Sequence, residues 1–241
     1  MSQTVYWLSP AGSVHLVAFG LAIPLLALLQ RRKLVAAGWP LGLRLPHYRR
    51  GVASLIAFAA LSLATAWRQG LQLFPASIDR PWISVAAAIA MYVIAITVMR
   101  PRWRRAVERG SPHVYLFMPD TREERGWWIA VSIFAGISEE ITWRGVQPAL
   151  VAFVVGSPEA GALVAAISFG VAHATQGWKA ASIVVIFALA FQGLVWLSGT
   201  LVLAMAVHAA YDATAGLAYA RFGRHLGYKV PPKAPTPPKN P

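Results

Sequence analysis

The sequence contains no cysteine, which excludes a disulfide framework, a thiol nucleophile and a thiolate metal site. Any metal ion would have to be held by histidine, aspartate and glutamate. Charged residues are also scarce, at 13% of the 241 residues, whereas 57% are hydrophobic and the mean hydropathy is +0.52. A soluble globular domain of this size does not normally combine these values. The composition therefore predicts an integral membrane protein.

Acidic residues are scarcer than basic ones, with 9 Asp and Glu against 22 Lys and Arg, so the formal net charge is +13. The basic residues are clumped in a few connecting stretches. In a membrane protein such clumps mark the cytoplasmic loops. We therefore expect the charge to reflect membrane topology and predict no nucleic-acid partner.

A spanning helix needs about 20 largely apolar residues, and seven stretches approach that length. They cover residues 12–30, 51–67, 82–99, 127–155, 159–175, 180–197 and 200–220. A signal peptide carries basic residues before its apolar region, and no basic residue precedes the first stretch. We therefore interpret this stretch as a retained helix. The predicted fold is all-α, a polytopic bundle of about seven transmembrane helices with a polar cavity between the later ones.

The distribution of basic residues predicts how this bundle is oriented. Lys and Arg lie between the first two stretches, between the third and fourth, and after the seventh. The short connections 156–159 and 198–200 contain none. Since loops rich in Lys and Arg remain in the cytoplasm, we expect the N-terminus outside and the C-terminus in the cytoplasm.

The predicted span ends carry two further signals. Indole rings prefer the membrane interface, so we interpret the tryptophans near span ends as anchors. These are Trp82, Trp103, Trp127 and Trp128. Thr121 and Glu124 have the Thr-x-x-Glu spacing of a capping box at a helix start. We expect the carboxylates of that segment to be caps and not catalysts.

The chain divides into three predicted regions. Residues 1–118 hold the first helices and the basic loops, and residues 119–221 hold the helices with buried polar groups. Residues 222–241 end in a proline-rich, weakly apolar sequence, which predicts an extended, disordered cytoplasmic tail.

The fourth predicted span places three charges within six residues, at Glu139, Glu140 and Arg144. Each charged side chain in a span costs about 2.5 to 3.5 kcal/mol, so such groups are paired or line a wet cavity. On an α-helix Glu140 and Arg144, four apart, share a face and can pair, while Glu139 points elsewhere. We predict Glu139 to be unpaired and to face a cavity. The alternative is that both glutamates only hold the bundle together.

Two later spans also contribute ionisable groups. The fifth carries His173, one helical turn after Phe169, and the seventh carries His208 and Asp212 on one helical face. Alone, each is better explained as packing or an intrahelical hydrogen bond. Because three helices each bring such groups, convergence on one polar pocket is the most favourable arrangement in lipid.

These residues form three motifs, Glu-Glu-x-x-x-Arg, Phe-x-x-x-His and His-x-x-x-Asp, in this order on late spans. The set resembles the CAAX protease and bacteriocin-processing family, which includes the prenyl-protein CAAX endopeptidases. The resemblance covers roughly residues 119–221. It implies an intramembrane endopeptidase in which Glu139 and His173 activate a water, and His208 and Asp212 stabilise the oxyanion. Glu140 and Arg144 would then be a structural ion pair.

One position departs from the prenyl proteases, which carry asparagine where this chain has Asp212. An ionised aspartate cannot donate a hydrogen bond to an oxyanion. Either Asp212 is protonated, or it orients His208 so that the imidazole alone donates.

Two alternatives use the same residues. Glu139, His173 and His208 could supply three ligands of a zinc protease with an open position for water, although we expect no cofactor. The polar cluster could also serve a non-enzymatic proton- or ion-coupled transporter. The expected partners are the bilayer and a membrane-associated protein or peptide substrate, whose identity and prenylation the sequence leaves open. The Ala-, Arg- and Trp-rich composition resembles proteins of GC-rich bacteria, which suggests a bacterial plasma membrane.

Overall fold

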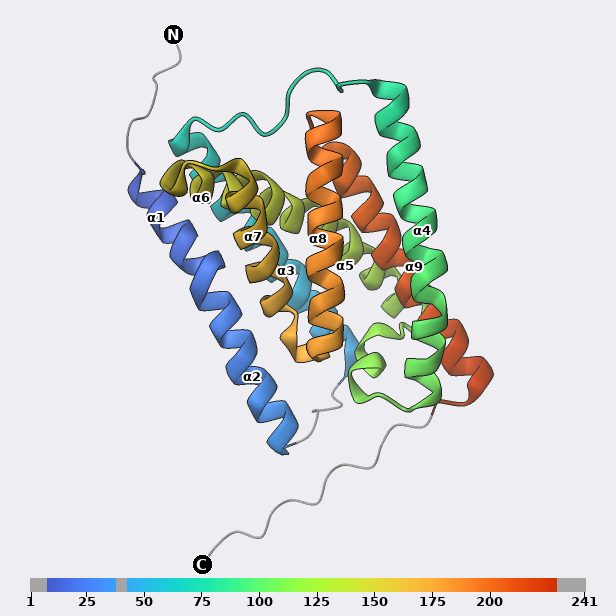
Figure 1. Cartoon of the computed structure of the whole chain (residues 1–241). Helices are drawn as coiled ribbons and strands as arrows, with labels where there is room; N and C mark the ends of the chain where they lie inside the picture. The colour runs from blue at the N-terminus through green and yellow to red at the C-terminus, as the bar shows by residue number, and fades with distance from the viewer. Residues whose placement is uncertain (1–7, 38–42, 229–241) are drawn as a thin grey trace, which may run out of the picture.

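The computed structural model describes residues 8–37 and 43–228, and every regular element within these ranges is a helix (Figure 1). The predicted all-α class is confirmed. The elements are α1 (Pro10–Val17), η1 (Ala18–Ala22), α2 (Ile23–Ala37), α3 (Arg44–Gln69), α4 (Pro81–Glu108), η2 (Pro112–Phe117), α5 (Arg122–Glu140), η3 (Ile141–Val146), α6 (Gln147–Val155), α7 (Pro158–Ala172), η4 (Ala174–Gln176), α8 (Trp178–Ser198) and α9 (Val202–Leu226). Elements η1 and η3 are π-helical turns inside longer helices, and η2 and η4 are 3₁₀ turns.

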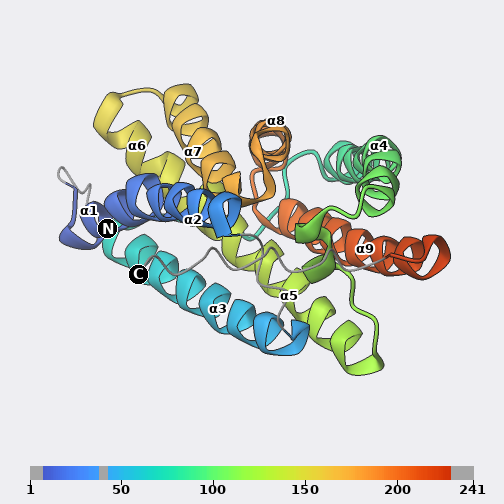
Figure 2. The same ribbon diagram turned by 90° about the horizontal axis from the view of Figure 1, so that it is seen from below.

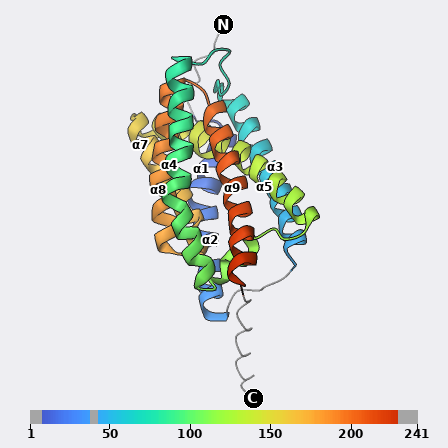
Figure 3. The same ribbon diagram turned by 90° about the vertical axis from the view of Figure 1, so that its right-hand side faces the viewer.

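Helix α5 lies within the bundle between α3 and α9 (Figure 2). Helix α4 runs beside α9 (Figure 3), while α7 packs between α6 and α8. Helices α1 and α2 join through η1 and pack against α3 and α7. The two helices that carry the Glu-Glu and His-x-x-x-Asp motifs, α5 and α9, are therefore direct neighbours.

Each of the seven predicted stretches overlaps a helix. Within the described residues, four helices are long and apolar enough to cross a membrane: Pro10–Ala36, Arg44–Gln69, Pro81–Glu108 and Trp178–Ser198. Helix Pro158–Ala172 is apolar but shorter. A polytopic helical bundle is supported, and the count of seven crossings remains a prediction.

Helices α5 and α9 approach each other closely at Gly136. A Cβ atom at this position would lie 2.7 Å from the carbonyl oxygen of Met205 and 2.8 Å from the amide nitrogen of Ala209. Any side chain would therefore push the helices apart. Since Gly136 lies one turn before Glu139 and Ala209 follows His208, glycine here lets the two polar motifs meet.

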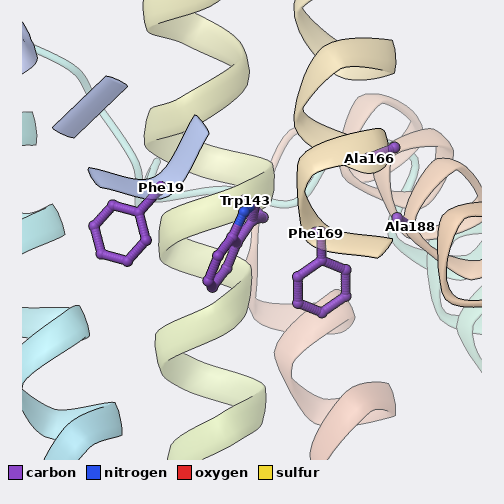
Figure 4. Packing of buried hydrophobic residues seen from close by; sticks show 5 residues of the cluster. All are labelled: Phe19, Trp143, Ala166, Phe169 and Ala188. Carbon is purple, nitrogen blue, oxygen red and sulfur yellow. The ribbon is translucent and has the colours of Figure 1, made fainter. Parts of the chain in front are cut away.

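One of the cores is a row of aromatic rings that links the first and later helices. Trp143 packs against Phe19 at 5.2 Å and against Phe169 at 5.0 Å between ring centroids (Figure 4). Ala166 and Ala188 complete this buried cluster. The row connects the π-helical turns η1 and η3 with the end of α7.

The capping box predicted at the start of α5 is confirmed. The Thr121 hydroxyl accepts from the Glu124 amide at 3.1 Å, and Glu124 Oε2 accepts from the Thr121 amide at 3.2 Å. Glu124 also pairs with Arg44 at 3.1 Å, which ties α5 to the start of α3.

The pH dependence of stability should report on this cap. Burial alone would raise the pKa of Glu124, but the amides of Asp120 and Thr121 and the Arg44 guanidinium together hold it below its ordinary value of 4.5. Because the pKa is lowered on folding, the stabilisation is present above pH 4.5 and lost as pH falls through the folded-state pKa. We expect Glu124→Ala to lower the unfolding free energy by about 1 kcal/mol at neutral pH and less in acid.

Denaturant unfolding in detergent at neutral and acidic pH measures this difference. The control is Glu123→Ala, since Glu123 pairs with Arg49 in an exposed ion pair and should contribute little. An equal loss for Glu124→Ala at both pH values would contradict the assignment.

The expectation that the four tryptophans are interfacial anchors is wrong for two of them. Trp82 is 86% exposed, as an anchor would be, and Trp127 is half-buried. Trp103 and Trp128 are only 3% and 6% exposed and pack inside the bundle. Their indoles contact aromatic rings of neighbouring segments, among them Tyr211, Tyr219, Tyr48 and Phe117.

Helix α9 continues to Leu226, past residue 222, where the sequence predicts the tail to begin. Phe222 and Leu226 pack against a buried cluster that includes Val107 and Val114, so the helix is stabilised beyond the predicted boundary. Most of the predicted tail, residues 229–241, lies outside the described residues.

Candidate active site

A cavity of about 500 Å³ extends from one end of the bundle to its middle. Its outer part is lined by the beginnings of α3, α5 and α8, the ends of α4 and α9, and η2. Basic side chains cluster at this end, with Arg102 and Lys179 in the lining itself. Four predicted site residues line it: Glu139, His173, His208 and Asp212.

The two adjacent glutamates at the end of α5 occupy different environments. The Glu140 side chain is fully buried, while that of Glu139 is 17% exposed and lines the cavity. This separation follows the predicted helical geometry. The prediction that Glu139 is unpaired is wrong, however, because its Oε2 lies 3.7 Å from His208 Nε2.

Arg144 lies beside Glu140, with 3.3 Å between Nη1 and Oε1, and both side chains are buried. The guanidinium carbon is 4.3 Å from the ring centroid of Phe169 and 5.4 Å from that of Phe191. Such cation–π contacts are stronger when desolvated. Arg144 lies in a π-helical turn, whereas the predicted pairing is that of a regular α-helix. Insertion of that turn leaves residues 140 and 144 in contact.

His208 joins all three carboxylates of the site. Its Nδ1 lies 2.7 Å from Glu140 Oε1, and its Nε2 lies 3.6 Å from Asp212 Oδ2 as well as 3.7 Å from Glu139. A carboxylate only accepts hydrogen bonds, so Nδ1 carries a proton and donates a hydrogen bond to Glu140 Oε1. This contact directs Nε2 toward the cavity.

His173 caps the end of α7, just after its last helical residue. Its Nδ1 lies 2.9 Å from the carbonyl oxygen of Phe169, which can only accept, so Nδ1 donates. In a neutral imidazole Nε2 then holds a lone pair. Phe169 thus contacts both His173 and Arg144, which accounts for a phenylalanine one turn before the histidine.

The residues proposed as zinc ligands do not form a metal-binding group. Across residues 8–37 and 43–228, no three His, Asp or Glu side chains are grouped closely enough to hold a metal ion. His208 Nδ1 is engaged by Glu140, and its Nε2 is shared between two carboxylates at about 3.6 Å and 3.7 Å. Zinc ligation by Glu139, His173 and His208 remains an alternative to the metal-independent mechanism.

Two contacts around the site were not predicted from the sequence. Phe191 of α8 lies against Arg144 and against the His208 ring, at 5.6 Å between centroids. Trp128 of α5 donates from Nε1 to the Asp212 carbonyl at 3.0 Å. Phe191 has no distinguishing signal, because it resembles any apolar residue of a span. Trp128 lies about three α-helical turns before Glu139, a spacing that places both residues on one helical face.

One protein family matches the segment that carries these site residues. Residues 122–214 match a family described as type II CAAX prenyl endopeptidase Rce1-like. The match covers less than half of the chain and includes all three motifs, from Glu139 to Asp212. No curated protein and no solved structure matches the chain significantly. The match supports an intramembrane endopeptidase of the CAAX type in general terms, and the family resemblance predicted from the three motifs is confirmed over residues 122–214.

Proposed function

We propose that the protein hydrolyses a peptide bond of a membrane-associated protein or peptide, using a water activated by Glu139 and His173. One observation carries this proposal: Glu139, His173, His208 and Asp212, which come from three segments distant in sequence, line a single cavity within the helical bundle. Buried ionisable groups in a membrane protein are costly, and their convergence supports a functional site.

In the proposed mechanism, Glu139 is the general base. Its carboxylate takes a proton from a water molecule, and the water oxygen attacks the carbonyl carbon of the scissile peptide bond. His173 assists because its Nε2 lone pair can accept the second hydrogen of that water while Nδ1 is held by the Phe169 carbonyl. Glu139 then returns its proton to the leaving amide nitrogen, which completes hydrolysis.

His208 stabilises the oxyanion that forms in this step. With Nδ1 donating to Glu140, its Nε2 is the nitrogen that faces the cavity, and a protonated imidazole donates from there to the oxyanion. Three carboxylates within 4 Å of the ring supply the balancing negative charge. Asp212, 3.6 Å from Nε2, orients the imidazole and need not donate itself.

Glu140 and Arg144 act as the structural pair in this proposal. Glu140 is fully buried and contacts Arg144 and His208, so it is not available to a substrate in the cavity. Glu140 holds the His208 imidazole through Nδ1, the ring nitrogen that does not face the cavity. The division of labour between the two glutamates is thus supported by their different exposure.

The basic residues at one end of the bundle suggest how the protein is oriented in the membrane and from which side the substrate enters. Basic residues gather at the end where the cavity opens, and loops rich in Lys and Arg remain in the cytoplasm. We therefore propose that the cavity opens toward the cytoplasm of a bacterial cell and that the substrate enters from that side. Aromatic side chains such as Phe117, Phe187 and Tyr219 in the lining favour an apolar segment of the substrate.

Cleavage of peptides by the purified full chain in liposomes tests the proposal. The panel should contain a prenylated CAAX peptide, the same peptide without the prenyl group, and an unrelated membrane-anchored peptide. Mass spectrometry in H₂¹⁸O should find one ¹⁸O atom in the new carboxylate of a cleaved peptide. No cleavage of any membrane-associated peptide, together with proton flux that depends on Glu139, would support the transport alternative instead.

Metal dependence has its own test. We expect exhaustive treatment with a chelator to leave activity within about twofold, because the proposed rate enhancement comes from Glu139 and His173 and not from a Lewis acid. Activity is measured before treatment, after treatment, and after zinc is added back. Complete loss with recovery on zinc addition would refute the metal-independent mechanism.

A further inference from the structure

A buried chain of hydrogen bonds connects the first helices to the π-helical turn η3. His15 Nδ1 lies 3.0 Å from Gln147 Oε1, and His15 Nε2 lies 3.0 Å from the Ser62 hydroxyl. The Ser62 hydroxyl lies 2.8 Å from the Thr142 hydroxyl. All four side chains are fully buried. Two of them, His15 and Ser62, lie outside the segment that matches the family.

The direction of these hydrogen bonds follows from donor chemistry. Gln147 Oε1 only accepts, so His15 donates from Nδ1. In a neutral imidazole Nε2 then accepts, and Ser62 must donate to it. Ser62 has a single hydroxyl proton, so Thr142 donates to Ser62. The four groups form one consistent neutral chain. Loss of Ser62 leaves both His15 Nε2 and the Thr142 hydroxyl without this partner, and loss of the Thr142 hydroxyl removes the one bond that links Ser62 to η3.

The chain holds both ends of the turn that carries Arg144. Thr142 is the second residue of η3, and Gln147 directly follows its last residue. The backbone N–H of Gln147 donates to the backbone carbonyl of Thr142, five residues earlier, and this hydrogen bond defines a π-helical turn. Both contact points are therefore on the backbone segment whose unusual geometry places Arg144.

Glycine at position 20 makes room for this contact. A Cβ atom there would lie 2.8 Å from Gln147 Nε2. Gly20 belongs to the other π-helical turn, η1, which follows His15 by one helical turn. Phe19 of that turn packs on the His15 ring at 4.5 Å and on Trp143 at 5.2 Å. The two π-helical turns thus fit against each other around the polar chain.

We propose that His15, Ser62, Thr142 and Gln147 form a positioning network for the active site. They hold η3 so that Arg144 stays against Glu140, and Glu140 in turn keeps His208 Nε2 directed into the cavity. π-Helical turns occur often at functional sites. This inference rests on the proposed endopeptidase function, and it assigns His15 and Ser62 as positioning residues supplied by helices α1 and α3.

A valine in place of Thr142 tests the network, because it preserves shape and removes only the hydroxyl. Small misplacements at an active site reduce turnover by up to about 100-fold, so we expect kcat to fall about 10- to 100-fold with KM within about twofold. Thr142→Ser keeps the hydroxyl and should restore kcat to within about threefold of wild type. Ser62→Ala breaks the same chain from α3 and gives an independent variant if Thr142→Val does not fold.

Thr65→Val is the matched control. Thr65 is as fully buried as Thr142 and lies one turn from Ser62, but its hydroxyl donates within its own helix to the Leu61 carbonyl. Its kcat should stay within about twofold of wild type, since no bond to η3 is lost. An unchanged kcat in both Thr142→Val and Ser62→Ala, or an equal loss in Thr65→Val, would overturn the positioning role.

A readout without substrate separates this inference from the proposed function. ¹⁵N-histidine NMR of the full chain in micelles should show shifted His208 ring signals in Thr142→Val and unchanged ones in Thr65→Val. The endopeptidase proposal fails if wild type cleaves no peptide or if Glu139→Gln cleaves as fast as wild type. The His208 signals would still show in that case whether the network positions His208. Unchanged His208 signals in Thr142→Val would overturn it.

Discussion

Glu139→Gln should fold normally and lose at least about 10²- to 10⁴-fold in turnover, the usual effect of removing a general base. Glutamine keeps the shape and the hydrogen-bonding capacity of glutamate but cannot take a proton from water. The structure explains why folding should be unaffected. Glu139 is partly exposed to the cavity, and His208, 3.7 Å from it, still has Glu140 and Asp212 as neighbours.

His173 gives a second test of the same step. His173→Ala should lose activity by a similar factor, and the Glu139→Gln/His173→Ala double variant should be little worse than either single variant. Non-additivity is expected because both side chains act on one water. The measurement is single-turnover cleavage of a membrane-embedded peptide by variants matched for thermal unfolding. Near-normal turnover by Glu139→Gln would refute the mechanism and return the cluster to a transport or structural role.

The structure changes what is expected of His208. Loss of an oxyanion donor costs about 10²- to 10³-fold in turnover. Because His208 also donates to buried Glu140, His208→Ala should in addition lower stability. Glu139→Gln should therefore lower turnover alone, whereas His208→Ala should lower both turnover and stability.

Convergence of the polar residues could be predicted because charge within an apolar span has a large energetic signal. The high cost of burying Glu139, Glu140 and Arg144 predicts partners for them, and the later spans offer His173, His208 and Asp212. The capping box at Thr121 was predictable for a similar reason, since helix ends leave amides that local side chains must satisfy. The positions of the helices followed from long apolar runs.

The arrangement around η3 could not be predicted in the same way. Apolar spacing predicts a regular α-helix with a period of 3.6 residues through residues 139–144, whereas a π-helical turn begins at Ile141. The contact between Ser62 and Thr142 of this turn joins two hydroxyl groups. Hydroxyl groups are common in spans and often form hydrogen bonds within their own helix, so they gave no signal. His15 is a single neutral imidazole, so it also lacked a signal. The tertiary contacts that fix this turn come from helices distant in sequence.

Tryptophan burial shows a second limit of sequence patterns. Indoles near the end of an apolar run are typical of interfacial anchors. Trp103 and Trp128 lie at such ends, yet the loop containing η2 folds over this end of the bundle and supplies Phe117 against Trp128. Sequence position gives depth along a helix but not which side of the helix faces lipid.

Glu140→Gln should lower the stability of the protein by about 3 to 5 kcal/mol, the usual effect of removing one partner of a buried ion pair. Among residues 8–37 and 43–228, Arg144 makes an ion pair only with Glu140, so the substitution strands a guanidinium between Phe169 and Phe191. It also removes the anion that accepts from His208. Thermal and denaturant unfolding in detergent measure the loss, with Glu139→Gln as the adjacent control.

Arg144→Ala should also destabilise the protein, but less than Glu140→Gln, because Glu140 keeps the 2.7 Å contact with His208. Replacing both partners by apolar residues, as in Glu140→Leu/Arg144→Met, should recover part of the stability while activity stays lost. Recovery is expected because a fully apolar pair leaves no buried charge without a partner. Activity is not recovered, since His208 Nδ1 no longer has the Glu140 carboxylate as its hydrogen-bond acceptor. Wild-type stability of both single variants would show that the pair does not hold the bundle together, and Glu140 would then need another role in the site.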